Sequence, residues 1–290
     1  MFETISFLVA LIGSSLAALF DVKITPTEIP NEIPYAMIAL ALLIAGVQSL
    51  IEFNYVILLQ SLIYGISFLV FGYLRYKIGH WGGGDALVLA AIGFLSPTFS
   101  SLAQNIQWPF ALSYLLNLFV IGEGVYMFVY AIGLALVNRK IFAEFFKNVK
   151  SSSKIIMASS LVLFLLFLAG DYLLLYAFKL PIDFQFIVVN SLILLFYSIF
   201  LFLLWKFVNA VNKVAFKKRI PVSKLKVGDI LLESRVYEGI TKKELIKIRR
   251  SRKKLVWIKE GVKFAPAFPL ALLFTMFFGD SIFLFLKLLL

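Results

Sequence analysis

Long runs of apolar residues separated by short polar stretches make up most of this chain. An α-helix needs about 20 consecutive apolar residues to cross a bilayer. Runs near this length predict spanning helices at 2–20, 33–50, 55–74, 86–104, 110–137, 156–178, 184–205 and 265–289. The pattern therefore predicts an all-α polytopic membrane protein with about eight transmembrane helices.

One long stretch, 206–264, breaks the apolar pattern, because it holds 18 Lys and Arg against five Asp and Glu. Short strands are predicted at 226–232 and 255–258. Thr241 and Glu244 have the spacing of a capping box, which predicts a short basic helix running to about residue 252. The stretch is predicted to be a small basic cytoplasmic α+β module, either held against anionic lipid or used to dock a substrate.

These patterns divide the chain into three predicted parts: a membrane domain at 1–205, the basic module at 206–264 and a C-terminal transmembrane helix at 265–290. Basic residues in the connections predict the orientation. Connections with one Lys between them (51–54, 105–109 and 179–183) alternate with connections that hold two, five and eighteen basic residues (75–85, 138–155 and 206–264). Since Lys and Arg favour the cytoplasmic side, both termini are predicted outside and the loop 21–32 inside.

Composition narrows the classes of function. With 61% hydrophobic residues and 31 Phe, a soluble domain could not bury its apolar surface. There is no cysteine and one histidine, His80, which excludes thiolate chemistry and multi-histidine metal sites; no metal or cofactor is expected. The net charge of +12 is explained by positive-inside sorting and attraction to anionic lipid headgroups, and no nucleic-acid partner is expected.

The candidate chemistry centres on Trp81-Gly82-Gly83-Gly84-Asp85, where a polar segment meets an apolar run. Ionisable groups at the edge of hydrocarbon mark functional sites, and glycines allow another backbone to approach closely. A second reading is a glycine-rich helix start whose acid is favoured by the helix dipole. A second acid, Asp21, is predicted at the same membrane face, which favours the functional reading.

Two carboxylates without an activated Ser or Cys suggest aspartic proteolysis. Like charges cannot both ionise cheaply, so the pair shares a proton: one acid activates water while the other polarises the scissile carbonyl. Three further acids lie inside apolar runs, Glu123, Asp171 and Asp280, either as interhelical contacts or in direct functional roles. They leave open an alternative, a proton- or cation-coupled transporter.

These residues resemble a known family. Gly82 to Asp85 fits the GxGD signature of intramembrane aspartyl proteases, and Asp21 followed by Ile29-Pro30-Asn31 is similar to the first-aspartate motif of type IV prepilin peptidases. The segment 262–269, Val-Lys-Phe-Ala-Pro-Ala-Phe-Pro, resembles the proline-containing segment that this family carries before its last helix. The basic module is similar to the archaeal preflagellin and pilin peptidase branch.

The resemblance implies an aspartic endopeptidase, without N-methyltransferase activity, that removes short basic leaders from precursors with a hydrophobic helix. Cleavage would occur at the cytoplasmic face of the plasma membrane, and archaellin and pilin substrates both remain open. Asp21 and Asp85 are the expected catalytic pair. The expected substrate-binding residues are Gly82, Gly83 and Gly84, the prolines Pro266 and Pro269 that shape the floor of the site, and Glu28 and Glu32, whose charge would attract the leader.

Overall fold

The computed structural model describes residues 2–23, 29–99, 108–179, 181, 183–232, 239–251, 254–259 and 262–289. Its elements are α1 (Phe2–Lys23), α2 (Glu32–Ile51), α3 (Val56–Lys77), α4 (Gly83–Leu95), η1 (Ser96–Thr98), α5 (Phe110–Asn117), the π-helix η2 (Leu118–Tyr126), α6 (Met127–Val137), α7 (Lys140–Ser151), α8 (Ser153–Ala177), α9 (Phe184–Val214), β1 (Lys217–Pro221), η3 (Val222–Lys224), β2 (Ile230–Leu231), α10 (Lys242–Arg250), β3 (Leu255–Lys259), α11 (Ala267–Phe278) and α12 (Ser281–Leu289).

Six helices of the described chain are long and apolar enough to cross a membrane. They are α1, α2, α3, the continuous stretch Phe110–Val137 formed by α5, η2 and α6, and then α8 and α9. These six agree with predicted spans, and the protein is a multi-pass membrane protein. The predicted count of eight is not confirmed, because two apolar helices are shorter, Gly83–Thr98 and Ala267–Phe278.

The fourth predicted span, 86–104, corresponds to α4, which is a shorter, buried helix. Its residues from Val88 to Leu95 are all buried, and α4 packs against α3, α2 and α1. A continuous apolar run is typical of a helix enclosed by protein as well as of one facing lipid. The remainder of the predicted span, 100–104, lies outside the described residues.

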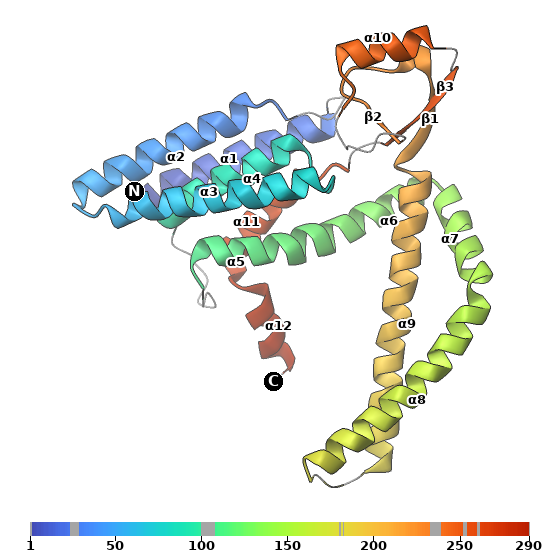
Figure 1. The fold of residues 1–290 in the computed structure, drawn as a ribbon. Helices are drawn as coiled ribbons and strands as arrows, with labels where there is room; N and C mark the ends of the chain where they lie inside the picture. Colours follow the sequence, from blue (N-terminus) through green and yellow to red (C-terminus); the bar gives the residue numbers. More distant parts are fainter. Residues whose placement is uncertain are drawn as a thin grey trace. The chain divides into compact units, whose positions relative to one another are not determined.

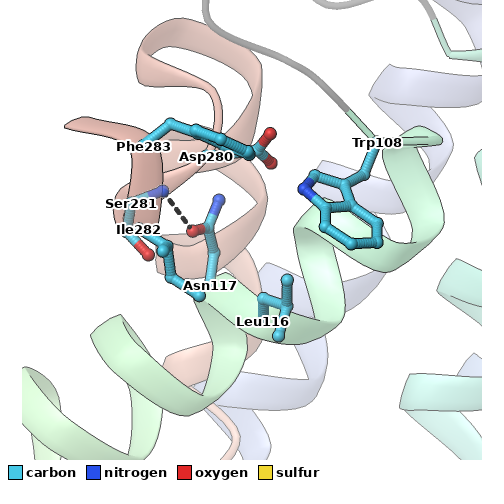
Figure 2. A pocket seen from close by; sticks show the side chains of 7 residues that line it. All are labelled: Trp108, Leu116, Asn117, Asp280, Ser281, Ile282 and Phe283. Carbon is cyan, nitrogen blue, oxygen red and sulfur yellow. Dashed lines mark hydrogen bonds between the residues drawn. The ribbon is translucent and has the colours of Figure 1, made fainter. Parts of the chain in front are cut away.

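The prediction of one unbroken final helix is wrong. Gly279 has a φ of 76°, which ends α11, and α12 begins two residues later. Asn117 holds the break: its amide nitrogen donates to the Thr275 hydroxyl at 2.9 Å and to the Gly279 carbonyl at 2.7 Å, and its oxygen accepts the Ser281 N–H at 3.0 Å. Figure 2 shows Asn117 facing Ser281 inside a small pocket, whose other lining residues are Trp108, Leu116, Asp280, Ile282 and Phe283.

The chain forms two compact units, Met1–Tyr130 with Lys218–Leu290, and Ala131–Lys217. In the first unit α1 to α4 lie alongside one another (Figure 1), and α11 packs between α1 and η2. In the second unit α8 and α9 form a long antiparallel hairpin, and α7 packs on α9. The predicted domain boundaries at 205 and 264 stay a prediction.

The basic module contains a three-stranded sheet in the order β1-β3-β2 and the helix α10. Strand β2 pairs antiparallel with β3, with Ile230 opposite Lys259 and Leu231 opposite Ile258. The Thr241–Glu244 capping box opens α10 as predicted. Strand β1 was not predicted, since its charged sequence lacks the alternation of a half-buried strand. The apolar core consists of Val222, Leu225, Ile240, Leu245, Val256 and Ile258.

Candidate active site

The first predicted catalytic residue, Asp21, lies in the last turn of α1 with 7% of its surface exposed. A carboxylate at a helix C-terminus is disfavoured by the helix dipole, so this position needs other support. The backbone N–H of Ala265 donates to Asp21 Oδ2 at 3.1 Å. Lys263 donates through Nζ to the Val22 carbonyl at 2.7 Å, which places a positive charge at the helix end. The segment before α11 therefore supports Asp21.

The second predicted catalytic residue, Asp85, lies in the first turn of α4 and is also 7% exposed. Its Oδ2 accepts the backbone N–H of Gly82 at 2.9 Å. This is the helix-start arrangement that the sequence offered as an alternative reading, and here it coexists with burial beside a second acid. Helix α1 packs against α4, and the carboxyl groups of Asp21 and Asp85 are close enough to repel each other when ionised.

Tyr126, at the end of η2, completes this arrangement. Its hydroxyl donates to the Lys263 carbonyl at 2.6 Å, and it lies within electrostatic range of both Asp21 and Asp85. Sequence reasoning missed Tyr126 and Lys263, because nothing local marks a Tyr in an apolar helix or a Lys in a basic module.

The glycine motif is tightly packed at one position. A Cβ added to Gly84 would lie 2.7 Å from the Cβ of Ile29. Glycine is therefore required at this position, because the Ile29 side chain lies against its backbone. A Cβ on Gly83 would meet only Tyr76, at 4.0 Å, and one on Gly82 would meet Asp85 itself at 3.3 Å. Substrate binding by these three glycines stays a prediction.

The remaining predicted substrate contacts are placed as follows. Pro266 precedes α11, and Pro269 lies in its first turn, where a missing N–H costs no hydrogen bond. Glu32 is exposed at the start of α2. Glu28 lies outside the described residues.

The three other acids inside apolar runs all have structural neighbours. Glu123 pairs with Arg75 and accepts the Trp81 indole N–H at 3.2 Å. Asp171 is buried and accepts hydrogen bonds from Asn190 and Ser191 on α9, each at 2.9 Å. Asp280 is 3% exposed and follows the break at Gly279. For Glu123 and Asp171 the interhelical reading is confirmed.

No group of three or more His, Cys, Asp or Glu side chains converges in the described ranges. The arrangement offers two buried carboxylates, each bonded to a backbone N–H at a helix end. Such a pair has the parts needed to share one proton.

Comparison with known proteins identifies the segment that holds both acids. Residues 8–137 match the type IV leader peptidase family. Over these residues the chain is similar to that family. The resemblance predicted from the Asp21 and Asp85 motifs is thereby confirmed.

A curated relative extends the similarity beyond the leader peptidase segment. Prepilin peptidase EppA from Methanothermobacter thermautotrophicus is 24% identical over 185 residues, which cover 59% of this chain and 47% of the relative. The chain thus spans about half the length of that relative. Neither similarity supports the transporter alternative.

Proposed function

We propose that this protein is a membrane-embedded aspartic endopeptidase that removes short basic leaders from type IV pilin-like or archaellin precursors. One observation carries the proposal: Asp21 and Asp85, 64 residues apart in sequence, are both buried in one compact unit, on the helices α1 and α4 that pack against each other. A water molecule between the two carboxyl groups would be deprotonated by the ionised acid, while the protonated acid donates to the scissile carbonyl.

The placement of the acids suits a substrate that enters from an aqueous face. Asp21 ends its helix and Asp85 begins its own, so both lie at the same end of adjacent helices. The proposed face is the cytoplasmic side of the plasma membrane, because the basic connections favour that side. Glu28 and Glu32 would attract the basic leader, and Pro266 and Pro269 would border the site.

The deciding experiment measures leader removal by the purified full chain in detergent or lipid, using prepilin and prearchaellin precursors. Asp21→Asn and Asp85→Asn are each expected to lower the cleavage rate by about 10²- to 10⁴-fold, the contribution typical of a general acid or base. Asp171→Asn makes the same chemical change at a buried acid in the other unit and is expected to cleave like wild type. Near-normal activity in either site variant would refute the catalytic pair.

A second arm of the same experiment tests the leader-binding acids. With Glu28 and Glu32 both changed to Lys, KM is expected to rise for a basic leader and to stay unchanged for a leader whose Lys and Arg are neutralised. Equal KM changes for both leaders would contradict electrostatic recognition. Mass spectrometry of the new N-terminus tests the accompanying prediction of hydrolysis without N-methylation.

A further inference from the structure

One tryptophan contacts the supports of both aspartates. Trp81 directly precedes the glycine motif and is 6% exposed. Its ring stacks on Phe264, with centroids 5.2 Å apart and planes at 26°, and meets Phe268 edge-on at 5.9 Å. These two phenylalanines flank Ala265, whose N–H binds Asp21. Trp81 therefore joins the segment that begins α4 to the segment that supports Asp21.

Two charged side chains hold this tryptophan in place. The indole nitrogen of Trp81 donates to Glu123 Oε1 at 3.2 Å. The same oxygen pairs with the Arg75 guanidinium, whose carbon lies 5.2 Å from the centre of the Trp81 ring. A cation over an indole face is favourable, more so where water is excluded. Arg75 comes from α3, Glu123 from η2 and Phe268 from α11, so three elements contact one ring.

The π-helix η2 connects the same two segments a second time. Its Glu123 accepts from Trp81, and three residues further on η2 ends at Tyr126, which donates to the Lys263 carbonyl. π-Helical turns interrupt regular packing and occur frequently at functional sites. Here η2 contacts the supports of both acids through Trp81 and Lys263.

We propose that Trp81, Arg75 and Glu123 are positioning residues that fix the separation of the two aspartates by holding the start of α4 against residues 264–268. This inference rests on the proposed function. Because these side chains act through Trp81 and not on the substrate, losing them lowers kcat and leaves KM nearly unchanged. A displacement of the reacting groups by about 1 Å lowers the rate on the order of 100-fold.

The test compares two variants and their combination. Glu123→Gln keeps an acceptor for the indole but loses the ion pair, and Trp81→Phe keeps an aromatic ring but loses the N–H donor. Each is expected to lower kcat by about tenfold or more with KM within about twofold. Both substitutions remove the same contact between Trp81 and Glu123. The kcat of the double variant is therefore expected to be only slightly lower than that of the more impaired single variant. Asp171→Asn, a neutralised acid in the other unit, is the matched control.

A spectroscopic signal separates positioning from general loss of folding. Subtracting the emission of Trp81→Phe isolates Trp81 among the four tryptophans. Glu123→Gln is expected to shift that emission at unchanged melting temperature and Asp171→Asn is not. If Glu123→Gln fails to fold, Arg75→Lys, which keeps the charge and loses the planar stacking, serves in its place with a smaller loss of kcat.

The outcomes are distinct. Wild-type kcat in Glu123→Gln, or losses that multiply in the double variant, would overturn the positioning role and leave the proposed function intact. If wild type cleaves no precursor, the proposed function fails. The Trp81 emission then decides alone: no shift in Glu123→Gln overturns the inference, and a shift supports it.

Discussion

The dipeptide Gly-Asp occurs in both compact units, at Gly84-Asp85 and at Gly170-Asp171, in opposite surroundings. Around Gly84 there is no room for a side chain, because its Cβ would meet Ile29 at 2.7 Å; around Gly170 there is nothing within 4 Å. Asp85 bonds to a backbone N–H at the start of its own helix. Asp171 lies within a helix, and both of its oxygens accept side-chain donors from the neighbouring helix.

The difference separates the proposed catalytic acid from an acid that joins two helices in the same apolar setting. Both oxygens of the Asp171 carboxylate are engaged in holding α8 to α9. Asp85 accepts one backbone hydrogen bond at Oδ2 within the described chain and lies within electrostatic range of Asp21. Burial is similar, 9% exposed for Asp171 against 7% for Asp85, so the two acids differ in their partners and not in their burial.

The largest effect expected from this comparison is that of adding one methyl group next to each acid. Gly84→Ala forces the start of α4 away from Ile29 and is expected to lower the cleavage rate at least tenfold and stability by about 1–3 kcal/mol, as overpacking does. Gly170→Ala has room and replaces a glycine inside a helix, so stability is expected to rise by about 0.5–1 kcal/mol. Thermal unfolding and cleavage rates of both variants measure this difference.

The matched glycines make the result interpretable. A fall in activity with both variants would point to a general sensitivity of the apolar helices to substitution. Unchanged activity in Gly84→Ala would show that the close approach of Ile29 does not set the position of Asp85.

A smaller effect is expected from removing the acid in the hairpin. Asp171→Leu leaves the Asn190 amide and the Ser191 hydroxyl without their acceptor, and hydrogen bonds between membrane helices average about 0.6 kcal/mol. We expect a loss of about 1 kcal/mol for the two bonds together, a smaller loss in Asp171→Asn, and wild-type kcat in both. Reduced kcat in Asp171→Asn at full stability would give this acid a role in catalysis and break the comparison.

Local sequence was sufficient to predict most of the membrane helices and both candidate catalytic acids. Apolar runs of about 20 residues predicted the six long helices because bilayer thickness fixes their length. The final helix was mispredicted because one glycine with positive φ, Gly279, breaks it, and a hydropathy pattern contains no backbone angles. The predicted span 86–104 runs past the end of α4 at Leu95, because an enclosed helix is as apolar as one that faces lipid.

The supports of the site could not be predicted, because they depend on how the helices are packed. Arg75 and Glu123 are 48 residues apart, and Asp21 and Ala265 are 244 apart. Their meeting depends on helix rotation and on the π-helical stretch, neither of which leaves a periodic signal. The sequence indicated Glu123 only as one of three acids inside apolar runs, and its partner Trp81 only as the start of a motif.

The smallest expected effect concerns the ion pairs of the two units. Arg75 and Glu123 are both largely enclosed, whereas in the other unit Lys213, which donates to Glu144 at 2.6 Å, is 63% exposed. Exposed pairs contribute little and are screened by salt. Glu144→Gln is therefore expected to change the melting temperature only slightly and to leave cleavage unchanged.

The pH dependence of that small effect has a definite sign. The hydrogen bond from Lys213 lowers the pKa of Glu144 below its ordinary value of 4.5. A carboxyl whose pKa is lower in the folded state stabilises the fold above the unfolded-state pKa and loses this contribution as pH falls through the folded-state value. The melting temperatures of wild type and Glu144→Gln are thus expected to differ slightly at pH 7 and to converge in acid, and also in about 1 M salt, where the screening length is about 3 Å. A difference that grows in acid would show that Glu144 stabilises the packing of α7 on α9 through its uncharged contacts. The contrast between enclosed and exposed pairs would then rest on packing instead of charge.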